Sequence, residues 1–133
     1  FQSITRRVAK FNTFTGRTSN IVKTFYDNLF EMAPLIKPLF KSDREIVEQH
    51  FHDLVSLAVN EIDNFSEFRP RLVELGTRHK SYGAEITHFS IIKMAFMLAL
   101  QYEFKDLFND SMENAWSNFI DEISNAMIEG LNN

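Results

Sequence analysis

The sequence predicts an all-α fold in a single domain spanning residues 1–133. The 133 residues include four glycines and three prolines, and no stretch alternates apolar and polar residues as a half-buried strand does. Apolar residues instead recur every three or four positions, which is the period of an amphipathic helix. With 44% hydrophobic residues, the chain is long enough to bury one core and too short for two.

Five apolar stripes and two short segments predict about seven helices of uneven length. The stripes consist of Ile4, Val8 and Phe11; Ile21, Phe25 and Leu29; Val47, Phe51, Leu54, Val55, Ala58 and Ile62; Phe89, Ile92, Phe96 and Leu100; and Met112, Trp116, Phe119, Ile123 and Met127. We expect the second helix to start after Gly16, at Thr18 or Ser19. A short turn runs from Pro34 to Phe40.

Two local signals predict where one long helix and one short helix begin. The stretch SDRE, from Ser42 to Glu45, fits a capping box, in which the serine and the glutamate each satisfy a free amide at a helix start. Pro70 is expected to open a short helix that ends at Gly83.

Composition narrows the function. A formal net charge of −4 argues against binding to nucleic acid or to an anionic membrane. The absence of cysteine excludes disulfides, zinc–thiolate sites and thiol nucleophiles. No run of about 18 apolar residues predicts a membrane span, and residues 1–10 contain no signal-peptide core. These features predict a cytoplasmic protein, and the missing initiator methionine suggests a domain of a longer polypeptide.

The stretch LVELGTRHKSYG places a histidine on the apolar face of the short helix. At about 100° per residue, Leu72, Leu75 and His79 fall within a sector roughly 60° wide. A backbone carbonyl one turn earlier can bond one ring nitrogen, which leaves the other free to bind a metal, a proton donor or a substrate. A hydrogen-bonded core histidine is the alternative. Fourteen phenylalanines require either a wide core or a flat planar group to pack against.

Four ordered motifs resemble the globins, in particular bacterial haemoglobins and the haem domains of flavohaemoglobins, which have a three-over-three helical fold. The motifs are FYDNLFEMAPLIKPLF, LGTRHKSYG, HFSIIKMAFMLAL and NAWSNF. The resemblance covers nearly the whole chain. It implies haem b (iron protoporphyrin IX), with His79 as the proximal iron ligand, held by the carbonyl of Leu75.

The resemblance also implies the surroundings of the haem. The expected cofactor-binding residues are Phe40, Val47, Phe51, Leu72, Leu75, Arg78, Ala84, Phe89, Tyr26 and His50. Cations available for the haem propionates are Arg78, Lys80, His88 and Lys93, each of which is equally compatible with an ordinary solvated charge. The acidic residues Glu113, Asp121 and Glu122 are expected on a solvated face.

The distal side departs from the family pattern. The position 32 residues before His79, typically glutamine or histidine, is Val47, which cannot donate a hydrogen bond. The expected hydrogen-bond donor to bound dioxygen is then Tyr26, which matches the family's distal tyrosine. His50 is the second candidate for this role, and His52 is expected in solvent. Bonding of Tyr26 to a backbone carbonyl or a water is the alternative. We expect a five-coordinate ferrous haem.

The leading functional hypothesis is reversible binding of dioxygen or another diatomic gas (carbon monoxide or nitric oxide), by a carrier or by the sensing domain of a protein with an output domain. The alternative is a nitric oxide dioxygenase or peroxidase-like enzyme that depends on an external reductase. Phe89 disfavours it, because the flavohaemoglobin proximal network has a tyrosine there and phenylalanine has no hydroxyl. A haem-free interaction domain is the third hypothesis. The sequence predicts no oligomeric state.

Overall fold

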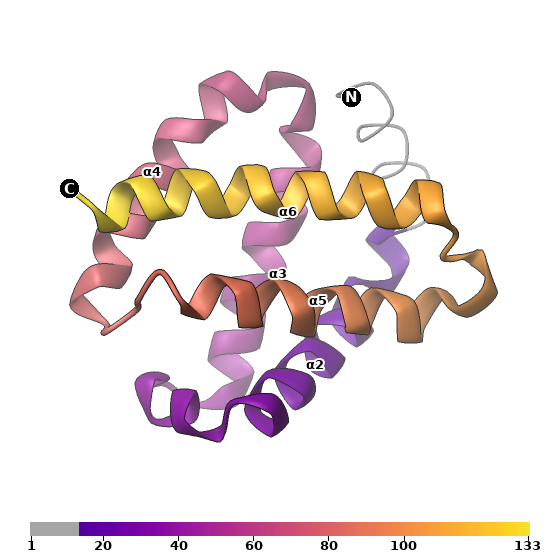
Figure 1. The fold of residues 1–133 in the computed structure, drawn as a ribbon, viewed down its shortest axis with the longest axis horizontal. Helices are drawn as coiled ribbons and strands as arrows, with labels where there is room; N and C mark the ends of the chain where they lie inside the picture. The colour runs from indigo at the N-terminus through magenta and orange to yellow at the C-terminus, as the bar shows by residue number, and fades with distance from the viewer. Residues whose placement is uncertain (1–13) are drawn as a thin grey trace.

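The computed structural model describes residues 14–133, and all of its regular structure is helical (Figure 1). The predicted stripe at Ile4, Val8 and Phe11 lies outside the described residues. The α-helices are α2 (Phe14–Met32), α3 (Arg44–Asn60), α4 (Phe65–Ser81), α5 (His88–Phe104) and α6 (Asp110–Leu131). Three 3-10 helices are η1 (Pro34–Leu39), η2 (Ile62–Asn64) and η3 (Lys105–Leu107). The predicted all-α class is confirmed.

The helices pack in two main pairs, α4 against α6 and α2 against α5. Helices α5 and α6 lie side by side across the front of Figure 1, and α3 passes behind them and packs on α2. None of the helices in residues 14–133 is both long and apolar enough to span a membrane.

The core lies where the sequence stripes predict it. Phe25 and Trp116 are almost completely buried, at 2% exposure each, and Phe96 lies between them with ring-centroid distances of 5.8 Å and 6.1 Å. Phe119 extends the same row of rings from Trp116. The phenylalanine-rich composition therefore fills a continuous aromatic core that joins α2, α5 and α6.

Two predicted helix starts are wrong. Helix α2 begins at Phe14 and continues through Gly16, before the expected start at Thr18. Helix α4 begins at Phe65 and contains Pro70, instead of starting there. Proline removes one backbone hydrogen bond close to the helix start, and burial of Phe65 and Phe68 in the core stabilises this added turn. Gly83, just after α4, has a φ of 89°, as expected for a glycine that ends a helix.

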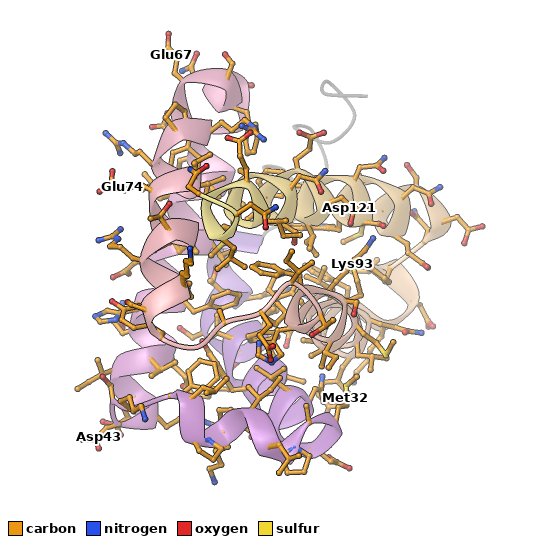
Figure 2. All side chains as sticks on the ribbon, turned by 60° about the vertical axis from the view of Figure 1, so that its left-hand side comes forward. Met32, Asp43, Glu67, Glu74, Lys93 and Asp121 are labelled. Carbon is orange, nitrogen blue, oxygen red and sulfur yellow. The ribbon has the colours of Figure 1, made fainter. Side chains whose placement is uncertain are left out.

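The predicted capping box at Ser42 is also wrong. The N-cap of α3 is Asp43, and no side chain bonds the free amides there. Arg44 instead joins α3 to α2, because its guanidinium donates to the carboxylates of Asp27, at 2.7 Å, and Glu48, at 2.6 Å. A tertiary ion-pair cluster thus holds this helix start, which in Figure 2 is the corner labelled Asp43.

Helices α4 and α6 cross at two glycines that no sequence motif marked. A Cβ atom at Gly76 would lie 2.0 Å from the carbonyl oxygen of Met127, and one at Gly130 would lie 2.0 Å from that of Val73. The Thr77 hydroxyl donates to the carbonyl of Gly130 at 3.1 Å. The two backbones therefore approach so closely that neither position accommodates a side chain.

Candidate functional site

The imidazole of His79 lies in the last turn of α4 and is half-buried. Its Nδ1 lies 2.8 Å from the carbonyl oxygen of Leu75, one turn earlier, as predicted. Since a carbonyl can only accept, the Nδ1–H is the donor, and the neutral ring then carries its free lone pair on Nε2. This is the tautomer in which an imidazole binds a metal through Nε2.

Residues 14–133 bring no group of three or more histidine, cysteine, aspartate or glutamate side chains together as a metal site. His79 therefore belongs to no protein-built metal cluster in this part of the chain.

Tyr26 lies at the centre of an aromatic cluster formed by α2, the end of η1 and α3. Its ring contacts four phenylalanines: Phe25 at 4.8 Å, Phe30 at 5.7 Å, Phe40 at 5.7 Å and Phe51 at 5.8 Å. The phenol is the one polar group among the five rings, so its hydroxyl is the one hydrogen-bond donor that these side chains carry.

Burial raises the pKa of the Tyr26 phenol well above its ordinary value, and the carboxylate of Glu48 raises it further, while Arg44 lowers it in part. The side chain is 4% exposed. The phenol therefore stays protonated over the physiological pH range and remains a donor.

Helix α3 carries the remaining distal candidates. Val47 and Phe51 are half-buried and pack against the core, whereas His50 is exposed and makes no ring contact with the aromatic cluster. His52, expected in solvent, is instead half-buried. Its Nδ1 is buried with no hydrogen-bond partner among the described residues and lies 3.5 Å from the carboxylate of Asp53. The expectation that His52 is solvated was wrong, because the stripe of one helix does not show which neighbours cover its edge.

The apolar residues predicted around the cofactor differ in burial. Leu72 is 1% exposed and Phe89 is 9% exposed, so both are part of the core. The others pack on the core but keep part of their surface accessible; they are Phe40, Val47, Phe51, Leu75 and Ala84. They present apolar surface of the kind that a flat, hydrophobic cofactor buries.

Three of the four predicted propionate cations have other partners. The Nζ of Lys93 on α5 lies 2.8 Å from a carboxylate oxygen of Asp121 on α6, and Figure 2 shows the two facing each other. The Nζ of Lys80 donates to the carbonyl of Asn133 at 3.0 Å. His88 accepts a hydrogen bond from the backbone amide of Glu85. The fourth cation, Arg78, is exposed, and no partner for its side chain is described in residues 14–133.

A model of the globin family matches residues 23–127, more than half of the chain. The chain belongs to the globin family. Two plant relatives of this globin are both named anaerobic nitrite reductases. The relative from Gossypium hirsutum is 25% identical over 135 residues, covering 90% of this chain and 83% of the relative. The relative from Oryza sativa subsp. indica is 23% identical over 118 residues, covering 84% of this chain and 81% of the relative.

Solved globin structures share the fold. A hexacoordinated haem protein from an anhydrobiotic tardigrade, at pH 4, has a TM-score of 0.81 and 23% identity, covering 92% of this chain and 88% of that one. The deoxy haemoglobin of Mustelus griseus has a TM-score of 0.77 and 18% identity, covering 96% of this chain and 94% of that one. The predictions of a globin fold and of a haem-binding globin are confirmed at the level of the family.

Sequence reasoning missed Gly76, Gly130 and Tyr82. A glycine inside a helical stripe is a weak sign of close backbone approach, and two such glycines were present in the sequence. Tyr82 follows α4 directly, and its ring centroid lies 5.4 Å from that of His79. The two residues are three positions apart, a spacing at which side chains on a helix meet, and this spacing is the signal that could have predicted the contact.

Proposed function

We propose that this globin binds haem b through Nε2 of His79 and reversibly binds a diatomic gas, dioxygen above all. The observation that carries the proposal is the hydrogen bond between His79 Nδ1 and the Leu75 carbonyl, which selects the tautomer whose Nε2 binds iron. Haem, when bound, supplies an iron with an open coordination position for the gas.

The chain's own residues fit such a group. Leu75 and Ala84 offer apolar surface close in sequence to His79, and Phe40, Val47 and Phe51 offer it on the expected distal side. Arg78, exposed one residue before the ligand, is the cation best placed in sequence to meet a propionate. In this proposal the apolar groups bind and orient a flat ring and exclude water from its faces.

Tyr26 is the residue that discriminates among gases in this proposal. A protonated phenol donates a hydrogen bond to a partly negative ligand such as dioxygen and gains little from carbon monoxide. Val47 and Phe51 offer no donor. The loss of one such hydrogen bond, about 1.4 kcal/mol, corresponds to about a tenfold change in an equilibrium or rate constant.

The test is stopped-flow measurement of gas dissociation from the ferrous protein. Tyr26→Phe keeps the ring and its packing, and we expect about tenfold faster dioxygen dissociation with nearly unchanged carbon monoxide dissociation. Tyr102→Phe removes a phenol from an exposed site on α5 (68% exposed) and serves as the matched control. Equal effects on both gases, or none, would refute the assignment of Tyr26.

Five-coordinate ferrous iron is expected at rest. His50 is exposed on α3, so its imidazole would have to swing inward to reach the iron. A low-spin spectrum that disappears in His50→Ala would overturn this coordination and leave the His79 assignment standing.

Nitrite reduction is a second candidate function, favoured by the names of the two plant relatives. It needs an electron donor and access of nitrite to the iron. Anaerobic mixing of the ferrous protein with nitrite, followed optically with and without a reductant, tests it; sustained turnover would make the protein an enzyme. Nitric oxide dioxygenation stays less favoured, since the buried Phe89 has no hydroxyl for a proximal network.

A further inference from the structure

Tyr82 contacts the candidate iron ligand through its ring. The centroids of the Tyr82 and His79 rings lie 5.4 Å apart with an interplanar angle of 71°, which is the edge-to-face geometry that aromatic pairs prefer. Tyr82 is 56% exposed, so the core does not dictate where its ring lies. Of the ring contacts described in residues 14–133, this is the one that involves His79.

The backbone after α4 folds back onto the same residue. The carbonyl oxygen of His79 accepts hydrogen bonds from the amides of Tyr82, at 3.0 Å, and Ala84, at 3.1 Å. The intervening Gly83 has a φ of 89°, a conformation that glycine adopts without strain. A Cβ atom at Gly83 would lie 3.3 Å from Leu39 Cδ2, so the side chain at the end of η1 lies next to this turn.

Two contacts from different residues therefore meet on the His79 ring. The hydrogen bond to the Leu75 carbonyl holds Nδ1 but allows the ring to rock about that point. A second contact, from the Tyr82 ring on a turn hydrogen-bonded to the His79 carbonyl, restricts the remaining rotation about the Cβ–Cγ bond, and so restricts the direction in which Nε2 points.

We propose that Tyr82 is a positioning residue that, together with the Leu75 carbonyl, sets the orientation of the His79 imidazole toward the iron. The inference rests on the proposed role of His79 as iron ligand. The phenol oxygen has no part in it, because the contact is made by the ring.

The test compares Tyr82→Phe, which keeps the ring, with Tyr82→Ala and Tyr82→Leu, which remove it. In the ferrous protein, resonance Raman spectroscopy of the iron–histidine stretch should show a shifted and broadened band in the Ala and Leu variants and the wild-type band in Tyr82→Phe. In the apoprotein, the NOEs from the His79 ring protons to neighbouring residues of α4 should change in the Ala and Leu variants and match wild type in Tyr82→Phe. Chemical shifts are not the readout, because loss of a ring 5.4 Å away moves them through its ring current alone. The apoprotein measurement needs no haem, and the exposed position makes the fold tolerant of all three changes.

The outcomes separate the two proposals. A five-coordinate, high-spin ferrous protein without an iron–histidine band would overturn both the role of His79 and the positioning role; if the wild type is six-coordinate, the same measurement is made in the His50→Ala background. An iron–histidine band that is the same in wild type, Tyr82→Ala and Tyr82→Leu, with unchanged NOEs from the His79 ring protons in the apoprotein, would overturn the positioning role alone.

Discussion

Replacing Gly130 by alanine probes the close crossing of α4 and α6. The new Cβ atom would lie 2.0 Å from the Val73 carbonyl oxygen and 2.7 Å from the Thr77 amide nitrogen. Both are backbone atoms and cannot rotate away, so the helices must move apart. Gly76, at the same crossing, is three residues from His79, so this movement would also displace the candidate iron ligand.

The expected loss of stability follows from three contributions. Overpacking against backbone costs about 3 kcal/mol, at the upper end of the usual range. Moving the helices apart also removes the hydrogen bond from Thr77 to the Gly130 carbonyl, which costs less than about 1 kcal/mol because the hydroxyl can still donate to the Val73 carbonyl, also at 3.1 Å. The higher helix propensity of alanine returns about 1 kcal/mol. We therefore expect Gly130→Ala to lower the free energy of unfolding by about 2 to 3 kcal/mol, the sum of these contributions.

Urea unfolding of the apoprotein, followed by circular dichroism, measures this change without any cofactor. Asn125→Ala, at an exposed position of the same helix, is the control and should leave stability unchanged or slightly raised. Thr77→Val removes the hydroxyl alone and should cost about 1 kcal/mol. If Gly130→Ala is as stable as wild type, the two backbones do not approach as described and the reasoning fails.

Three further predictions concern single contacts. Burial raises the pKa of Tyr26 above the ordinary value of 10.0, so its contribution to stability is complete below pH 10 and is lost as the pH rises above that value. The free energy of unfolding, measured at increasing alkaline pH, should therefore fall more steeply in the wild type than in Tyr26→Phe. An equal fall in both proteins would contradict this prediction. Arg44→Ala should lower the free energy of unfolding by at most about 1 kcal/mol, since the Arg44 side chain is 44% exposed, and by less at high salt. A loss of stability that salt does not change would show that the ion pairs are not the cause. Val47→His should convert the ferrous haem protein to a low-spin, six-coordinate spectrum, whereas a high-spin spectrum identical to wild type would show that Val47 does not face the iron.

The parts of this globin that could be predicted from sequence are those set by local geometry. The bond from His79 to Leu75 joins residues four positions apart on one helix, so helical periodicity alone brings them together. Trp116 and Phe25 were expected in the core because they lie on long apolar stripes, and both are buried there. The helix end at Gly83 follows from the conformational freedom of glycine.

The wrong or missing predictions concern helix starts and a helix crossing, where contacts with another part of the chain determine the local structure. Local signals placed the start of α4 at Pro70, but burial of Phe65 and Phe68 in the core adds a turn before it. The capping motif that begins at Ser42 was overridden by the ion pairs of Arg44, whose partner Asp27 on α2 lies 17 residues earlier in the chain. The close approach of the two glycines at the crossing of α4 and α6 depends on how the two helices pack against each other. The apolar pattern of a single helix carries no information about that packing.

The most direct measurement of the central claim is the optical and electron paramagnetic resonance spectrum of His79→Gly after reconstitution with haemin. We predict loss of the wild-type axial signature, weaker retention of haem, and recovery of both when free imidazole is added to fill the space left by the side chain. His79→Gly with the wild-type axial spectrum and undiminished haem retention would contradict the account.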